Sequence, residues 1–239
     1  ALIEEDRRES VVPPKLSDEQ HAHGRPETFV TDCLIAVRAL DAVALKACID
    51  RAVIALPPAE FIDQVATPLM YKIGDLWYGG QLSPGHEHLA SSVMRNTLAE
   101  MAATLQPENG GPSIVISTPS GQRHEIGAVL VAATAELEGW SVTYLGPDLP
   151  ASDIAQAAVQ TNANVVALSI TVAGDGSEFK GELQALRQAL PSDAVILVGG
   201  QGAEPYKDYL SALGARYMED LPHVRHTLRE LTAEGGALH

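Results

Sequence analysis

The chain has 239 residues, of which 46% are hydrophobic and 20% charged, and its formal net charge is −15. This length and composition predict one large or two small globular domains with hydrophobic cores. The negative charge excludes a DNA-binding surface built from these residues, because nucleic-acid affinity depends largely on Lys and Arg side chains that neutralise phosphates.

Targeting and cysteine patterns indicate a cytoplasmic protein. The sequence has no apolar run of transmembrane length and starts with neither a secretory nor a transit segment, so we expect neither export nor contact with a membrane. Its two cysteines, Cys33 and Cys48, both lie within helical apolar patterns. We therefore expect buried thiols in a reducing compartment and no disulfide.

Residues 1–25 differ from the rest of the chain, and residues 9–25 lack hydrophobic periodicity. Residues 9–25 are polar and contain prolines, which is typical of a linker. The first ten residues, ALIEEDRRES, read like the end of a helix. We expect residues 1–25 to be a linker or the tail of an N-terminal domain that lies outside this chain.

Residues 26–107 have a helical pattern. Phe29, Cys33 and Val37 recur at one-turn spacing, which is typical of a helix with one apolar face. Three later helix starts carry capping or first-turn residues, namely Asp41, Pro57-Pro58 and Ser83-Pro84. Four helices joined by short loops predict an up-and-down four-helix bundle, which we expect to form a cap.

From residue 112 onward the period changes. Five short apolar runs alternate with segments of helix length, at 113–118, 141–146, 164–170, 194–200 and, more weakly, 215–219. Strands that alternate with helices predict a parallel sheet covered on both faces. We therefore expect a flavodoxin-like (Rossmann-like) five-stranded α/β domain over residues 112–239, with ligands bound beyond the carboxyl ends of its strands.

Three of these strand ends carry residues suited to a ligand. The turn after the first strand contains His124 within QRHEIG, which begins a helix. The third strand ends in Ser169-Ile170-Thr171, and the fourth ends in Gly199-Gly200. Glycines let a ligand approach the backbone closely because they lack a Cβ atom. An imidazole, a hydroxyl and a glycine pair that leaves room for a ligand are thus expected at one edge of the sheet.

This pattern resembles the cobalamin-binding domains of methionine synthases, mutases and corrinoid proteins, over residues 112 to 235. The resemblance implies that His124 is the lower axial ligand of cobalt. It further implies that Ser169 hydrogen-bonds the nucleotide tail of the cofactor. Close approach to that tail would fall to three glycines: Gly127, Gly199 and Gly200.

Two positions depart from the family pattern, Gln122 and Thr171. An acidic residue is usual two positions before the histidine, where it bonds the ring and strengthens its donation to cobalt. The neutral Gln122 would orient the His124 ring but polarise it less. We therefore expect a cobalt affinity or a trans-ligand strength that differs from the family norm.

A second group of candidate residues lies in the helical half. Trp77 ends one helix, and Glu87-His88 begin the next. A histidine near a helix N-terminus is biased toward its neutral form, which is the form that binds metals. Taken alone, this spacing favours a core tryptophan beside a capped helix start with His86 and His88 merely exposed.

Within a bundle that precedes a cobalamin-binding domain, the same spacing resembles the CarH-type adenosylcobalamin-dependent photoreceptor repressors of the MerR superfamily. The resemblance covers nearly the whole chain from Pro26 onward. It implies that Trp77 packs over the adenosyl group and that Glu87 contacts its ribose or base region. It also implies that His88 is free in the dark and can bind the upper face of cobalt after photolysis.

The sequence therefore predicts an adenosylcobalamin-binding light sensor of a transcriptional regulator, and not an enzyme. We expect a homo-oligomer, a tetramer in the dark, which light dismantles, and contact with DNA only through a domain absent from this chain. Two alternatives remain: a corrinoid methyl-carrier or methyltransferase subunit, and a cobalamin-binding antirepressor that never had a DNA-binding domain. Loading with methylcobalamin or adenosylcobalamin would separate the first alternative from the sensor.

Overall fold

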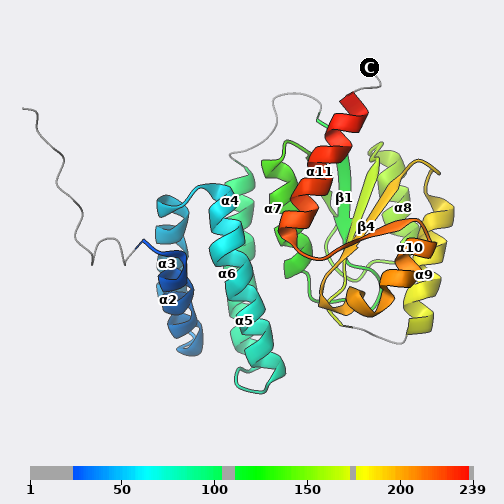
Figure 1. Ribbon diagram of the computed structural model, residues 1–239. Helices are drawn as coiled ribbons and strands as arrows, with labels where there is room; N and C mark the ends of the chain where they lie inside the picture. The colour runs from blue at the N-terminus through cyan, green and yellow to red at the C-terminus, as the bar shows by residue number, and fades with distance from the viewer. Residues whose placement is uncertain (1–23, 104–110, 173–175, 237–239) are drawn as a thin grey trace, which may run out of the picture.

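The computed structural model describes residues 24–103, 111–172 and 176–236 (Figure 1). A layer of helices precedes a sheet that has helices on both faces. This arrangement confirms the predicted class, a helical cap followed by a five-stranded α/β fold. The expected linker over residues 1–25 lies almost entirely outside the described residues.

The helical half consists of four long helices, the third of which combines three consecutive helical segments. They are α2 (Pro26–Arg38), α3 (Ala42–Ala55), a continuous third helix made of α4 (Pro58–Phe61), η1 (Ile62–Ala66) and α5 (Thr67–Tyr78), and α6 (Pro84–Ala102). The predicted caps are present. The Asp41 carboxylate accepts from the Ala44 amide at 2.9 Å, and Ser83 and His86 form a reciprocal capping box at the start of α6.

The third helix contains one π-helical turn, η1, at Ile62–Ala66. Its apolar residues Ile62, Val65 and Ile73 are fully buried in the bundle. Residues on another face of the same helix, including Met70 and Trp77, point toward the α/β half and line a cavity there. The third helix therefore serves two neighbours, the bundle core and the seam between the halves.

The α/β half contains a parallel sheet of order β2-β1-β3-β4-β5. Its strands are β1 (Ser113–Ser117), β2 (Ser141–Tyr144), β3 (Val165–Ser169), β4 (Val195–Gly199) and β5 (Ala215–Met218). The strand order reverses at β1, which lies between β2 and β3. The ligand crevice of such a sheet lies at this switch point, beyond the carboxyl end of β1.

The helices of this half are α7 (Ile126–Leu137), α8 (Ala151–Gln160), α9 (Gly176–Ala189), η2 (Gln201–Tyr206), α10 (Lys207–Ala212) and α11 (Leu221–Gly236). Residues of α7 and α11 share one apolar core with the helical half and with Ile114 and Ile116 of β1. Residues of α8, α9 and α10 form a second core with Val115 on the opposite face. The bundle is thus packed onto the α7 and α11 side of the sheet (Figure 1).

Two further findings concern the described residues. No helix among them has the length and apolar character needed to cross a membrane. Both cysteines are free thiols; Cys33 is buried, as the sequence predicts, whereas Cys48 is only half-buried.

Candidate cofactor site

A cavity of about 150 Å³ lies at the seam between the two halves. The third helix and α6 line one side of it, with Met70, Trp77 and Glu87 among the lining residues. The carboxyl ends of β3 and β4, the start of α7 and the start of α11 line the other side. The cavity therefore occupies the place where the sheet topology predicts a ligand.

The turn between β1 and α7, residues 118–125, is named the His loop. The Thr118 hydroxyl donates to the Gln122 carbonyl and accepts from the Asp148 amide at 2.9 Å. The Asp148 carboxylate in turn accepts from the Gly121 amide at 2.7 Å. The His loop is therefore fixed by its own polar contacts, which place His124 at the end of the first strand.

Gln122 does not orient the His124 ring, and that expectation is wrong. Its side-chain oxygen accepts from the amides of Thr171 and Val172 at 3.0 and 3.1 Å, and its amino group donates to the Val172 carbonyl at 2.8 Å. The Gln122 side chain is buried. Both its oxygen and its amino group are bonded to the backbone that follows β3. Gln122 therefore ties the His loop to the segment after β3.

The His124 imidazole lies in the cavity and meets Trp77 from the third helix. The two ring centroids are 5.0 Å apart, and the ring planes are inclined by 51°. Neither ring nitrogen of His124 has a hydrogen-bond partner among the described residues. The backbone carbonyl of His124 accepts a hydrogen bond from the Thr171 hydroxyl at 3.4 Å. The imidazole is thus available as a ligand.

Ser169 and Gly127 face each other at the floor of the cavity. A Cβ atom on Gly127 would lie 2.5 Å from the Ser169 Oγ atom, so the glycine makes room for the hydroxyl. Ser169 is only 6% exposed. Within the described ranges its hydroxyl has no hydrogen-bond partner, so it can bond a ligand that enters the cavity.

Gly199 and Gly200 also line the cavity, and contacts within the fold leave little room for a side chain at either position. A Cβ atom on Gly200 would lie 2.3 Å from the Ile170 carbonyl oxygen, and the φ angle of this glycine is +97°. A Cβ atom on Gly199 would lie 3.1 Å from the Met218 carbonyl oxygen. Close contact between strand ends therefore explains both glycines before any ligand is considered.

Glu87 and His88 diverge at the start of α6. Glu87 lines the cavity, and its carboxylate accepts from the Ser91 hydroxyl at 2.6 Å. His88 does not line the cavity; its side chain is 75% exposed and lies 3.6 Å from Glu87. His86 turns back to bond Ser83 and serves as part of the helix cap. An upper-ligand role for His88 would therefore require its side chain to turn.

The network around Glu125, the neighbour of His124, was not predicted from the sequence. Its carboxylate accepts from the Tyr144 hydroxyl at 2.6 Å and pairs with Arg95 of α6. Burial, together with this hydrogen bond, raises the pKa of Tyr144 well above its usual value. Glu125 thus connects the His loop to β2 and to the helical half.

Tyr71, on the third helix, is another cavity residue that was not predicted. Burial, and then the nearby Asp220 carboxylate, raise the pKa of its hydroxyl. The available signal was spacing: Thr67, Gly74 and Trp77 recur on one helical face with it. In the part of the chain that the structure describes, no three His, Cys, Asp or Glu side chains gather into a group that could hold a metal ion.

Two family models match the chain, and both are described as a B12 binding domain. One matches residues 30–101 and the other residues 112–228. The solved structure of the monomethylamine corrinoid protein of Methanosarcina barkeri has the same fold, with a TM-score of 0.65 and 17% identity over 88% of this chain and 99% of that chain.

Three curated relatives extend the comparison. The HTH-type transcriptional repressors CarA and CarH of Myxococcus xanthus are 34% and 32% identical, over 77% and 79% of this chain. The matched stretch spans 62% of the length of each repressor. Dimethylamine corrinoid protein 1 of Methanosarcina acetivorans is 26% identical over 80% of this chain and 91% of its own length. The chain thus contains two regions that match B12 binding domains, over residues 30–101 and 112–228, and most of it is similar in sequence to the repressors CarA and CarH.

Proposed function

We propose that this chain is the adenosylcobalamin-binding, light-sensing region of a cytoplasmic transcriptional regulator and has no catalytic activity of its own. The observation that carries the proposal is Trp77, an aromatic side chain of the helical half that lines the cavity and contacts the His124 ring. Adenosylcobalamin supplies a cobalt–carbon bond that light breaks. DNA binding belongs, in this proposal, to a separate helix-turn-helix domain, in keeping with the names of the repressor relatives.

The donor groups on the α/β side fit a cobalamin. His124 offers an imidazole nitrogen at the switch point, and Ser169 offers a buried hydroxyl without a protein partner in the described residues. Cobalt accepts imidazole readily as an axial ligand. We assign lower ligation to His124 and bonding of the nucleotide tail to Ser169. Gly127 supports that second role because it keeps the Ser169 hydroxyl accessible.

The groups on the helical side fit an upper ligand larger than methyl. Trp77 offers an aromatic surface, and Glu87 offers a carboxylate whose side chain is 13% exposed. An adenosyl group presents a base that can stack and hydroxyls that can donate to a carboxylate. These two residues therefore favour the adenosyl form of the cofactor over methylcobalamin.

The helical half must shift to admit the cofactor. With ring centroids 5.0 Å apart, Trp77 and His124 leave no room for a corrin ring between them. The Trp77 end of the third helix has to move away from the His loop on binding. We propose that the dark, loaded protein is a homotetramer and that light changes this assembly, because cap helices that move on loading move again when the adenosyl group leaves.

A corrinoid methyl carrier is the second candidate function. Its support is the match to dimethylamine corrinoid protein 1 over 91% of that protein's length. A methyl carrier must expose the upper face of cobalt to partner enzymes, whereas Trp77 and Glu87 cover that side of the cavity. This covering favours the sensor over the carrier.

Size-exclusion chromatography with absorption detection tests the proposed function. Protein loaded with adenosylcobalamin is run in the dark and again after green light, with methylcobalamin as the comparison. The sensor predicts a dark oligomer that becomes smaller after illumination, and weaker assembly with methylcobalamin. Equal assembly with both cofactors and an unchanged elution volume after complete photolysis would favour the carrier.

A further inference from the structure

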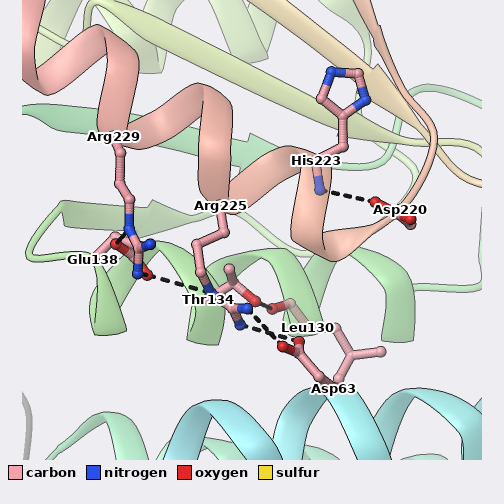
Figure 2. A network of polar contacts seen from close by, with 8 residues as sticks. All are labelled: Asp63, Leu130, Thr134, Glu138, Asp220, His223, Arg225 and Arg229. Atoms are coloured by element: carbon pink, nitrogen blue, oxygen red, sulfur yellow. Dashed lines mark hydrogen bonds and ion pairs between the residues drawn. The ribbon is translucent and has the colours of Figure 1, made fainter.

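Two ion pairs between described residues join the helical half to the α/β half. One is the Arg95–Glu125 pair beside the His loop. The other connects Arg225 of α11 to Asp63 in the π-helical turn of the third helix, with Arg225 donating from Nη1 at 2.6 Å and from Nη2 at 3.0 Å. Figure 2 shows Arg225 pointing from α11 toward Asp63. This bidentate geometry is the strong form of an arginine–carboxylate contact.

The Arg225–Asp63 pair is shielded from solvent and has a second carboxylate behind it. The side chains of Arg225 and Asp63 are 12% and 25% exposed. The Arg225 Nε atom lies 3.3 Å from Glu138 at the end of α7, and Glu138 also accepts from Arg229, one turn further along α11 (Figure 2). Glu138 therefore forms an ion pair with Arg225 on the α/β side without a hydrogen bond to its Nε atom, and Asp63 is the hydrogen-bonded contact in the helical half.

Asp63 and Trp77 lie at opposite ends of the third helix. Fourteen residues separate them, which corresponds to roughly 20 Å along a helix axis. The ion pair holds the Asp63 end against α11, and the ring contact holds the Trp77 end against His124. The second contact fills the space between Trp77 and His124 that a corrin ring would need in the proposed function. Trp77 can therefore leave His124 while the Asp63 end stays in place.

The π-helical turn makes Asp63 a suitable fixed point. A π turn uses i to i+5 hydrogen bonds and interrupts the regular α-helical ladder, and such turns occur frequently at functional sites. The turn at Ile62–Ala66 directly precedes α5, whose residues line the cavity. A change in bending at this turn therefore moves the whole cavity-lining segment.

We propose that Arg225 is the positioning residue of the helical cap: by holding Asp63 it fixes a pivot about which the third helix carries Trp77 onto or off His124. The proposal rests on the proposed function, because the motion it describes is the one that admits a cobalamin. Arg225 touches no ligand in this account and acts through Asp63 and the third helix. Loss of the pair frees the Asp63 end, so Trp77 leaves His124 more often in the cofactor-free protein.

The position of Trp77 can be measured without cofactor. The chain has two tryptophans, and replacing Trp140 by Phe leaves Trp77 as the only one. Trp140 is buried, and its Nε1 atom has no hydrogen-bond partner, so Phe loses no hydrogen bond there. In this background, acrylamide quenching of the fluorescence reports how exposed Trp77 is.

Arg225→Ala and Asp63→Ala are each expected to raise the quenching constant by about twofold or more. A twofold change corresponds to an interaction energy at the low end of the range measured for pairs of contacting residues. The double variant should show no more than either single variant, because both remove one contact. Arg229→Ala is the matched control, since Arg229 shares α11 and Glu138 with Arg225 but does not reach Asp63. Equal effects of Arg225→Ala and Arg229→Ala, or additive effects in the double variant, would overturn the pivot.

Circular dichroism shows whether the alanine variants fold. If they do not, a conservative variant tests the proposal instead. Arg225→Lys keeps the charge but loses the paired geometry, so it should give an intermediate quenching constant. A value equal to that of the parent would contradict the proposal.

A second readout uses hydroxocobalamin. Arg225→Ala should accelerate the association of hydroxocobalamin with the protein. The rate should rise by about the same factor as the fraction of molecules in which Trp77 has left His124. Arg229→Ala should not change this rate. An unchanged rate would overturn the pivot. A parent protein that binds no cobalamin would instead refute the proposed function, and the quenching result would still decide whether Arg225 positions Trp77.

Discussion

Around His124, most polar side chains are already hydrogen-bonded to other parts of the protein. Gln122 bonds the backbone of residues 171 and 172, and Thr118 bonds the His loop itself. Among the described cavity residues, the His124 imidazole and the Ser169 hydroxyl lack such partners, and so does the buried Thr67 hydroxyl on the third helix. Because burial of a polar group without a partner is costly, these groups mark where a ligand would bond.

Gln122→Glu should destabilise the protein. A carboxylate still accepts from the two backbone amides, but it cannot donate to the Val172 carbonyl, which lies 2.8 Å from the Gln122 amino group. The expected loss in the free energy of unfolding is about 1–3 kcal/mol in urea at pH 7. The loss should shrink at acid pH, where a protonated carboxyl regains a donor. Gln201→Glu, on an exposed glutamine, is the control; an equal effect there would contradict the assignment.

Gly127→Ala should clash with the Ser169 hydroxyl, because the new Cβ atom would lie 2.5 Å from Oγ. We expect a loss of about 1–3 kcal/mol in the free energy of unfolding. Adding Ser169→Ala should restore most of it, since the clashing atom is then gone. Gly181→Ala, in α9 with open space around it, should be neutral or stabilising. Failure of the double variant to recover would show that the clash is not the cause.

At the scale of single residues, the sequence predicted site residues whose side chains are suited to few kinds of chemistry. His124 and Ser169 line the cavity, as their positions at strand ends predicted, and Trp77 and Glu87 line it as the family resemblance implied. The partners of Gln122 were not predictable, because they belong to a segment about fifty residues away in the sequence. His88 differs from Glu87 by one helical step of about 100°, and only packing decides which of the two faces the cavity.

At the scale of elements, the third helix contributes to both the bundle core and the cavity. Its start at Pro57-Pro58 was predicted from proline chemistry, and the caps at Asp41 and Ser83 were predicted from their side chains. The π-helical turn at Ile62–Ala66 has no comparable sequence signal. The turn packs against α2, and a local sequence pattern does not contain such a contact.

Cys33 should make the stability of the bundle depend on alkaline pH. Burial, and then the nearby Cys48 thiol, raise its pKa from 9.0 to about 12 in the folded protein. Above pH 9 the unfolded chain loses this proton while the folded protein keeps it, so the contribution to stability is complete below pH 9 and declines as pH rises toward 12. Cys33→Ala should flatten this decline in urea unfolding measured from pH 8 to 11. An unchanged slope would contradict the burial of this thiol.

At the scale of the whole molecule, the two halves share one apolar core, and the cavity lies at their seam. Residues of α7 and α11 pack against both the sheet and the helical half. The change of period near residue 112 predicted the two halves and the strand count. The Asp63–Arg225 contact could not be predicted, because 162 residues separate its partners and no motif connects them.

Trp77→Ala should reduce the preference for the adenosyl cofactor. Stacking of a base on an aromatic side chain is worth roughly 1–3 kcal/mol, so the affinity for adenosylcobalamin should fall about tenfold. Affinity for methylcobalamin, measured by the same titration, should change little. Tyr78→Ala is the matched control, because Tyr78 follows Trp77 but is 91% exposed. Equal losses for both cofactors would make Trp77 a packing residue only.

The central claim, that His124 binds cobalt from below, can be tested by electron paramagnetic resonance. Protein labelled with ¹⁵N-histidine is loaded with cobalamin in the Co(II) state, in which the axial nitrogen splits the cobalt lines. An imidazole from the labelled protein should split each line into two, whereas the ¹⁴N base of the cofactor itself splits each line into three. We predict the two-line pattern for the parent protein and its loss in His124→Ala. A three-line pattern in the labelled parent would contradict the account.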